Sequence, residues 1–182
     1  MNLLNKKPYL LYVGNAFPHK NLERLVLAFG KLKKEKTNLN LILVGKIDYF
    51  YKRIKKLVKE LDLKDVYFPG KVSDKELKSL YKNALLYIFP SLEEGFGLPG
   101  LEAMKNKLPV ICSNKASLPE IYKDAALYFN PKNVSDIYKK ILNIINNKQK
   151  QKDLVKKGKK QVKKYSWEKC AKQTLKVYNS LE

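Results

Sequence analysis

Runs of consecutive apolar residues recur along the chain, separated by longer stretches of mixed polarity. Such runs predict buried strands, because a parallel sheet covered by helices on both faces has no strand side that faces water. Several runs end at a glycine or proline, as the first does at Gly14 and the fourth at Pro90. We expect six strands, over residues 9–13, 39–44, 66–68, 84–89, 110–112 and 125–129.

Between these runs, apolar residues recur every three or four positions, which predicts amphipathic helices. Two stretches, Ser73–Glu76 and Ser117–Glu120, have the spacing of capping boxes that open helices. Asn21 is placed to cap a helix that starts at Leu22, and Ser166 to cap the last helix. The expected helices follow residues 22–32, 51–61, 73–81, 99–105 and 117–120, with three more segments from about residue 135.

Strand and helix alternate six times, which predicts a single α/β domain over residues 1–182. Its sheet would be a doubly wound parallel sheet of about six strands with right-handed crossovers. Residues 133–182 would form a helical C-terminal extension of the same domain. Ligands of such sheets bind beyond the carboxyl ends of the strands, so the loops after the strands carry the candidate chemistry.

The charge of the chain is strongly positive, at +21 over 182 residues, but only two of its 38 basic residues are arginines. Sequence-specific readers of nucleic acid depend on arginine for bidentate contacts, so nucleic acid is a disfavoured partner. Lysine spread over the whole chain fits either a coding bias or an anionic partner such as a nucleotide or a membrane surface. The lysine-rich stretch 148–164 retains apolar residues, which predicts an exposed helix.

Two features bear on the compartment. The two cysteines, Cys112 and Cys170, make neither a disulfide framework nor a zinc cluster, which fits a reducing cytoplasm. No apolar run approaches the roughly 20 residues that span a bilayer, and the first eight residues lack the apolar stretch of a signal peptide. We therefore expect a cytoplasmic protein, with peripheral contact at the inner membrane face as an open alternative.

The glycine-rich loop over residues 91–102 is the most informative stretch. Gly95 and Gly97 allow backbone N–H groups to approach a ligand, and the helix near Pro99 directs its N-terminus to the same place, which favours phosphate. The carboxylates of Glu94 and Glu102 would repel phosphate, so they are expected to bind neutral hydroxyls of a ribose or sugar nearby. The alternative is that Glu102 only complements the helix dipole and Glu94 is a solvated loop residue.

The loop after the first strand carries a second candidate. Lys20 lies beside the start of a helix, where a cation gains nothing from the helix dipole, so neutralisation of a phosphate is a plausible role. The alternative is one more lysine in a lysine-rich chain. His19 is the single histidine, and an incidental loop position is favoured over acid–base catalysis.

Other site classes find little support. Paired carboxylates also occur in glycosidases, but no second acid is placed on another strand end across a cleft from Glu94. The chain has no Gly-x-x-x-x-Gly-Lys-[Ser/Thr] loop, and the turn after the first strand is not Gly-x-Gly-x-x-Gly. No cluster of histidine, cysteine and aspartate indicates a metal.

The stretch Glu93–Met104 resembles the signature of the retaining GT-B glycosyltransferases, the group 1 or family 4 set. Further stretches fall in the order of that family: Tyr12-Val13-Gly14 with Pro18-His19-Lys20-Asn21, Leu43-Val44-Gly45, Phe68–Ser73, Leu118–Ile121 and Tyr165-Ser166-Trp167. The resemblance covers nearly the whole chain. It implies the C-terminal, donor-binding Rossmann-like half of a GT-B fold, and transfer of a hexose from a nucleotide-diphosphate sugar.

The resemblance also implies residue roles. Lys20 would contact the donor diphosphate and Glu94 the transferred sugar, which makes these two the catalytic candidates. Glu102 would hold the ribose hydroxyls, and Val72 would lie against the base. The remaining donor-binding candidates are Gly14 and Asn15 in the first loop and the backbone N–H groups of Gly95, Phe96, Gly97 and Leu98.

Asn15 marks a departure from the family pattern, because many members carry arginine there as a second phosphate cation. Lys20 would then carry more of the phosphate binding, as in a subgroup that resembles mannosyltransferases. GDP-mannose is therefore the favoured donor and a UDP-sugar the next. No permanently bound cofactor and no metal are implied.

The family has two Rossmann-like domains with the active site between them, and this chain resembles one. The resemblance implies an N-terminal acceptor domain, supplied in cis or in trans, onto which the helix after Tyr165 would pack. Alone, the domain would bind the donor or its nucleotide but transfer slowly or not at all. Two alternatives stay open: a non-catalytic subunit of a split glycosyltransferase, and a basic module that binds membrane or nucleic acid.

Overall fold

The computed structural model describes residues 8–35 and 38–180, and six strands in this part form one sheet. All strand pairs are parallel, and the order across the sheet is β3-β2-β1-β4-β5-β6. The expected doubly wound α/β domain is therefore confirmed. The strands are β1 (Tyr9–Val13), β2 (Asn40–Val44), β3 (Val66–Gly70), β4 (Leu86–Phe89), β5 (Val110–Ser113) and β6 (Leu127–Phe129).

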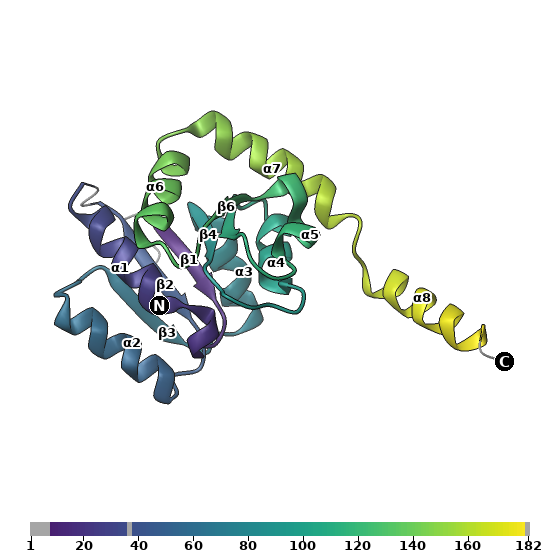
Figure 1. The fold of residues 1–182 in the computed structure, drawn as a ribbon, viewed down its shortest axis with the longest axis horizontal. Helices are drawn as coiled ribbons and strands as arrows, with labels where there is room; N and C mark the ends of the chain where they lie inside the picture. Colours follow the sequence, from purple (N-terminus) through teal and green to yellow (C-terminus); the bar gives the residue numbers. More distant parts are fainter. Residues whose placement is uncertain (1–7, 36–37, 181–182) are drawn as a thin grey trace.

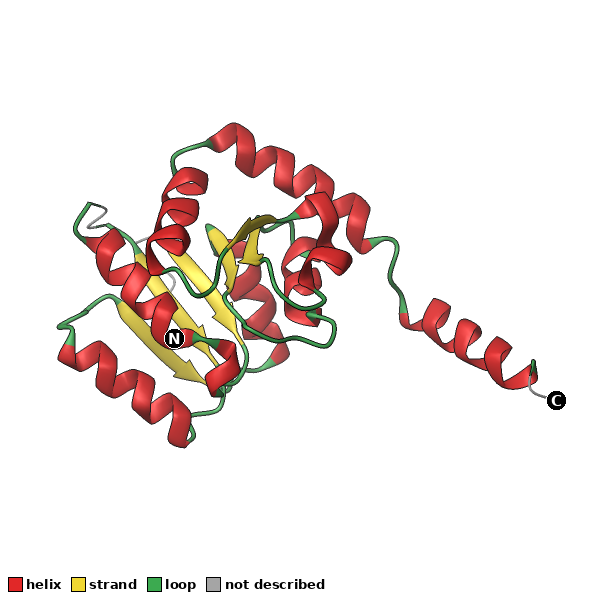
Figure 2. Ribbon diagram, viewed as in Figure 1, coloured by secondary structure: helices red, strands yellow, loops and turns green. Residues whose placement is uncertain are grey.

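Helices cover both faces of the sheet (Figures 1 and 2). Right-handed crossovers place α1 and α2 on one face and α3, α4 and α5 on the other, because the chain moves in opposite directions along the sheet before and after β3. The helices are α1 (Leu22–Lys33), α2 (Tyr49–Glu60), α3 (Asp74–Asn83), α4 (Leu98–Lys105), α5 (Leu118–Tyr122), α6 (Val134–Ile145), α7 (Lys148–Val162) and α8 (Trp167–Asn179), with 3₁₀ turns η2 (Pro18–Lys20) and η3 (Lys123–Ala125).

The core lies along the central strands. Leu10 of β1 pairs with Leu41 of β2 and Leu86 of β4, and none of the three has any exposed surface. Their apolar side chains are covered on both faces, which explains why these strands appear in the sequence as unbroken apolar runs.

Element boundaries differ from the expectation in a few places. β3 continues to Gly70, which pairs with Val44, although Pro69-Gly70 was expected to close the strand. β4 begins two residues later than expected because Ala84 ends α3, its N–H donating to the Leu80 carbonyl. α4 begins at Leu98, with Pro99 inside its first turn.

Two of the four predicted caps are confirmed and two are wrong. Ser73 and Glu76 form the expected capping box of α3, and the Ser166 hydroxyl accepts a bond from the Lys169 N–H at the start of α8. Asn21 precedes α1 and Ser117 precedes α5, but neither side chain caps its helix. Both side chains bind other loops instead, because tertiary partners outcompete a local cap.

The C-terminal segment is helical in three pieces, as predicted. α6 packs against α1 and α7 packs against α4, so both belong to the folded body. α8 projects away from that body in Figure 1, and every one of its residues is exposed. Both ends of the range 1–182 lie outside the described residues.

Candidate functional site

The loops after β1 and β4 meet at the carboxyl edge of the sheet. β1 and β4 are neighbours, yet their following helices lie on opposite faces, so a crevice opens between the two loops. The Leu92 N–H donates to the His19 carbonyl at 2.7 Å and joins the loops directly. The buried Asn21 amide donates to the carbonyls of Pro90 and Pro131, at 2.9 and 2.8 Å, which ties in the loop after β6.

This arrangement brings Lys20 and Glu94 together although 74 positions separate them. Lys20 Nζ lies 2.7 Å from Glu94 Oε1, and the two side chains are only 15% and 10% exposed. They border an open hollow of about 420 Å³ that is lined by His19, Lys20, Glu93, Glu94, Gly95 and Ala116. The two catalytic candidates from the sequence thus occupy one site.

The glycine-rich loop ends at the N-terminus of α4, as its sequence predicted. Gly97 occupies the N-cap position at φ +85°, a left-handed conformation that favours glycine, and no side chain caps the helix. Among the first three residues of α4, Pro99 has no N–H and the Gly100 N–H donates to the Gly97 carbonyl at 3.1 Å, which leaves the Leu98 N–H for an anion. The hydroxyl of Tyr122, a buried residue of α5, donates to the Gly97 carbonyl and fixes the turn.

Glu102 lies on the exposed side of α4, one turn into the helix. The Tyr81 hydroxyl donates to its Oε2 at 3.0 Å and, more weakly, to the Pro99 carbonyl at 3.4 Å. Burial, and secondarily the nearby Glu102 carboxylate, raises the pKa of Tyr81, so its phenol stays a neutral donor.

Gly14 and Asn15 form the start of the first loop. The Gly14 carbonyl accepts a bond from the Tyr51 hydroxyl at 2.9 Å, and the Asn15 carbonyl accepts one from the Tyr12 hydroxyl at 2.7 Å. The Asn15 side-chain oxygen accepts from the Phe17 N–H at 3.3 Å. The Asn15 amide is thus engaged within its own turn, while the loop backbone is anchored from the core.

Three further candidates, Phe96, Leu98 and Val72, do not line this hollow. Phe96 is 40% and Leu98 45% exposed, and the rings of Phe96 and Tyr165 pack edge to face with their centroids 5.4 Å apart. Val72 is half-buried after β3. With β2 between β3 and β1, the ends of those two strands lie about 10 Å apart, so Val72 is at the far side of the site.

Sequence reasoning missed three side chains that hold the site from outside its loops. The Ser117 hydroxyl donates to the Glu94 carbonyl at 2.9 Å, Tyr81 binds Glu102, and Tyr122 binds Gly97. Each comes from an element distant in sequence, and two are tyrosines that look like ordinary core residues. A tyrosine inside an apolar stretch does signal a buried hydroxyl that needs a partner, but it does not name that partner.

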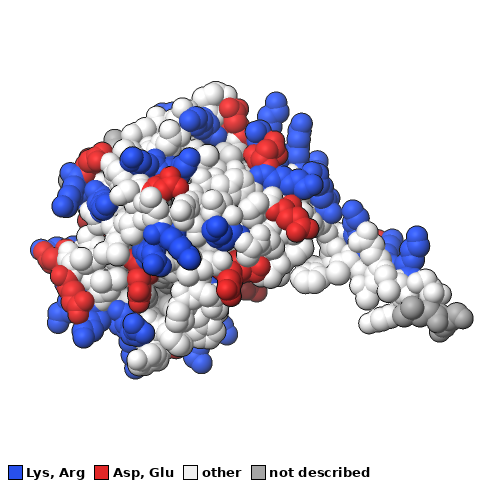
Figure 3. All heavy atoms as spheres, in the orientation of Figure 1, with Lys and Arg blue, Asp and Glu red and all other residues white. Residues whose placement is uncertain are grey.

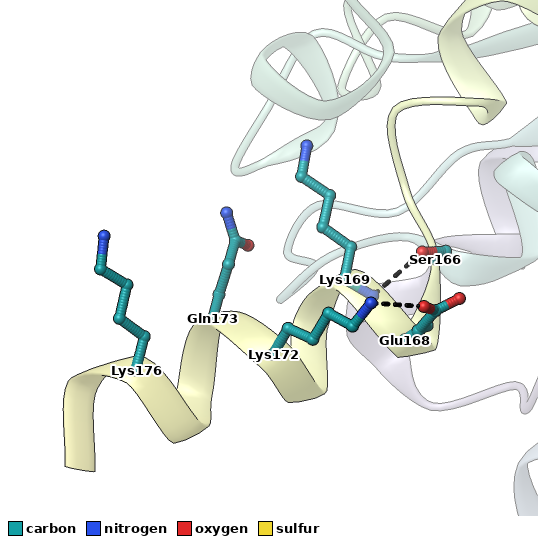
Figure 4. Close-up of a pocket in the computed structure, with 6 residues that line it drawn as sticks. All are labelled: Ser166, Glu168, Lys169, Lys172, Gln173 and Lys176. Carbon is teal, nitrogen blue, oxygen red and sulfur yellow. Dashed lines mark hydrogen bonds and ion pairs between the residues drawn. The ribbon is translucent and has the colours of Figure 1, made fainter. Parts of the chain in front are cut away.

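A second hollow, of about 450 Å³, lies along α8 and has no part in this site. Figure 4 shows Lys169, Lys172, Gln173 and Lys176 projecting from that helix, with Ser166 and Glu168 at its start. It is one polar face of a projecting helix, bordered by no loop from the carboxyl edge of the sheet.

Charge on the visible face of the body is mixed. Figure 3 shows acidic side chains interspersed among the basic ones, with basic side chains gathered along α7. Among residues 8–35 and 38–180, no three His, Cys, Asp or Glu side chains gather where they could share a metal ion. None of the helices in that part combines the length and apolar character that a bilayer crossing requires.

The conserved pattern of a known family matches nearly the whole chain, over residues 2–161, and that family is the glycosyl transferases group 1. The chain belongs to this family. O-antigen chain mannosyltransferase B from Escherichia coli is 36% identical over 178 residues, which cover 95% of this chain and 46% of that protein. O-antigen chain mannosyltransferase RfbU from Salmonella typhimurium is 43% identical over 129 residues, 69% of this chain and 35% of that protein.

The fold is shared with solved GT-B glycosyltransferases. Sucrose-phosphate synthase from Thermosynechococcus elongatus superposes with a TM-score of 0.87 and 30% identity, over 96% of this chain and 45% of that chain. Both the predicted family and the predicted GT-B type of fold are therefore confirmed. The group 1 chain described here spans less than half the length of each of these three proteins.

Proposed function

We propose that residues 1–182 are the donor-binding half of a retaining glycosyltransferase that transfers mannose from GDP-mannose. The family supports a nucleotide-sugar donor, and the mannosyltransferases among its relatives favour mannose. The observation that carries the proposal is the pairing of Lys20 and Glu94 beside the uncapped N-terminus of α4. A cation beside a helix N-terminus suits a diphosphate, and the carboxylate suits the hydroxyls of the attached sugar.

The proposed roles follow from this chemistry. Lys20 and the first turn of α4 bind the diphosphate and stabilise the negative charge that develops on it as the sugar leaves. Glu94 and the backbone N–H groups of residues 95–98 orient the sugar. Glu102 accepts hydrogen bonds from the ribose, and Val72 lies against the base.

Lys20 and Glu94 pair with each other before the donor binds. Each group satisfies the other in a largely buried place, where an unpaired charge would be costly. The donor offers each a replacement: phosphate oxygens for Lys20 and sugar hydroxyls for Glu94. Binding therefore exchanges partners without leaving either charge unpaired.

The test is a titration of the chain with GDP, UDP, ADP and dTDP, followed by amide NMR. We expect GDP to bind most tightly and to shift the amide signals of Gly95 and Gly97. Glu102→Ala should weaken binding by about 1–3 kcal/mol, the cost of a hydrogen bond to a charged group. Absence of binding by all four nucleotides at millimolar concentration would overturn the proposal.

The second part of the proposal is that α8 binds the acceptor half of the enzyme. Trp167, Leu175 and Tyr178 share one side of this helix and are 78%, 58% and 65% exposed. The opposite side carries Lys169, Gln173 and Lys176 (Figure 4). A helix with an apolar side but no partner in its own body needs another surface, and an acceptor domain in cis or in trans supplies it.

Co-expression tests this part. The chain is combined with the acceptor half of O-antigen chain mannosyltransferase B, and mannose transfer from GDP-mannose is measured. We expect transfer from the pair and little from the chain alone. Trp167→Lys should abolish co-purification, whereas the matched change Gln173→Lys on the polar side should not.

Peripheral contact with an anionic membrane is supported by α7. This helix carries seven lysines and one acidic residue, and it buries only Gly158 and Gln161 on its inner side. Cosedimentation with phosphatidylglycerol vesicles should therefore be strong at low salt and weaken steeply as salt rises. Equal sedimentation with neutral phosphatidylcholine vesicles would refute an electrostatic contact.

A further inference from the structure

A layer of buried tyrosines lies beneath the donor site. Their rings fill the core, and their hydroxyls point to the carboxyl edge of the sheet. Burial raises the pKa of each phenol, so each remains a neutral hydrogen-bond donor. The five donor–acceptor pairs are Tyr12 to the Asn15 carbonyl, Tyr51 to Gly14, Tyr87 to Val13, Tyr122 to Gly97, and Tyr81 to the Glu102 carboxylate.

Tyr81 is the member of this layer that binds a side chain of the site. Its residue is 2% exposed, and its ring packs against that of Tyr87, with 5.9 Å between the ring centroids. Tyr87 packs in turn against Phe89 at the same centroid separation. The Tyr81 hydroxyl therefore has a fixed position, set by the packing of α3 on β4.

Glu102, by contrast, is exposed on α4, where a glutamate side chain without a hydrogen bond would rotate about its side-chain bonds. An exposed glutamate that must bind a ligand in one orientation loses rotamer entropy on binding. Within the described residues, the hydrogen bond from the Tyr81 hydroxyl to Oε2 is the one that holds the Glu102 carboxylate. It fixes Oε2 and leaves Oε1 without a hydrogen bond to the described residues.

We propose that Tyr81 is a positioning residue that holds Glu102 in the orientation that receives the two vicinal hydroxyls of the donor ribose. The inference rests on the proposed role of Glu102 at the ribose and names the group that prepares it. A carboxylate oriented in advance accepts both hydroxyls without first losing its rotational freedom. Tyr81 itself does not touch the donor.

The test compares Tyr81→Phe with wild type for two ligands, GDP and 2′,3′-dideoxy-GDP, by amide NMR titration. Phenylalanine keeps the ring and removes the hydroxyl. If Tyr81 acts through Glu102 on the ribose hydroxyls, the variant should bind GDP about five- to tenfold more weakly, which is less than the loss of a whole hydrogen bond to a charged group because Glu102 itself is retained. It should bind the dideoxy nucleotide as wild type does, because that ligand has no hydroxyls for Glu102 to receive.

Tyr9→Phe is the matched control. Tyr9 is also 2% exposed, and its hydroxyl donates to the Leu80 carbonyl of the same helix α3 at 2.8 Å. This variant loses a buried tyrosine hydrogen bond to α3 but leaves Glu102 untouched. We expect wild-type affinity for both ligands.

The outcomes separate the two proposals. An unchanged GDP affinity in Tyr81→Phe, or an equal loss for GDP and the dideoxy nucleotide, overturns the positioning role while donor binding stands. A loss of the same size in Tyr9→Phe also overturns it, because general loosening of α3 would then explain the effect. If the wild-type chain binds neither GDP nor the dideoxy nucleotide, the donor-binding function itself is overturned.

Discussion

The pairing of Lys20 with Glu94 leads to a counterintuitive prediction: removal of a site carboxylate should strengthen binding of the nucleotide. Glu94→Gln keeps the shape of the side chain and removes its charge. GDP has a diphosphate but no sugar, so in wild type it must displace Glu94 from Lys20 and gains nothing from Glu94 in return. The variant frees Lys20 and removes the repulsion between carboxylate and phosphate.

The size of the effect follows from the geometry. Unit charges 2.7 Å apart attract by about 6 kcal/mol at an effective dielectric constant near 20, before any cost of desolvation. The net value of a hydrogen bond to a charged group is about 1.5–3 kcal/mol, and a glutamine retains part of it. We therefore expect a gain of about 1–1.5 kcal/mol, which makes GDP binding five- to tenfold tighter.

Isothermal titration calorimetry with GDP and GDP-mannose checks this reasoning. Glu94→Gln should favour GDP, with a smaller gain or a loss for GDP-mannose because the sugar hydroxyls lose a charged acceptor. Lys20→Met is the opposite control and should weaken both ligands. A weaker or unchanged affinity of Glu94→Gln for GDP would refute the idea that the carboxylate competes with phosphate for Lys20.

Three further predictions concern stability and reactivity. Gly100→Ala places a Cβ 2.2 Å from the Tyr122 hydroxyl and should destabilise the fold by about 1–3 kcal/mol in urea unfolding, whereas Gly95→Ala meets no atom within 4 Å and should cost far less. Burial raises the pKa of Tyr9 to about 12 and also raises the pKa of Tyr12 and Tyr87. The unfolded chain therefore loses its phenol protons first, so the free energy of unfolding should be constant up to about pH 10 and fall at higher pH, as midpoints of urea unfolding would report. Cys112 is buried and burial raises the pKa of its thiol, whereas Cys170 is exposed. A thiol reagent should therefore label one cysteine in the native protein and two in denaturant, and rapid labelling of both in the native protein would contradict the packing of β5.

The order and type of the elements were predictable because they depend on local patterns. The apolar run at 9–13 became β1 with the same bounds, and the capping box at Ser73–Glu76 opens α3 as expected. Local signals failed where a tertiary partner was stronger. The Asn21 amide reaches Pro90 and Pro131 and the Ser117 hydroxyl reaches Glu94, and no local pattern encodes such distant acceptors.

The candidate site was predictable in its parts. The resemblance to the family indicated Lys20, Glu94 and Glu102, and the position of their loops after strands placed all three at one edge of the sheet. The direct bond between Lys20 and Glu94 was not predictable, because the sequence gives no distance between side chains 74 positions apart. The tyrosines beneath the site were unpredictable for the same reason.

The fold class, the family and the loops that carry the chemistry follow from the sequence alone. Apolar periodicity and glycine placement act over a few residues, so a linear reading suffices for them. Which polar groups meet depends instead on the folded chain: Lys20 binds Glu94, Tyr81 binds Glu102, and Ser117 binds the Glu94 carbonyl. Those pairings arise from the strand order β3-β2-β1-β4-β5-β6, which makes the first and fourth strands neighbours and brings distant loops within hydrogen-bond reach.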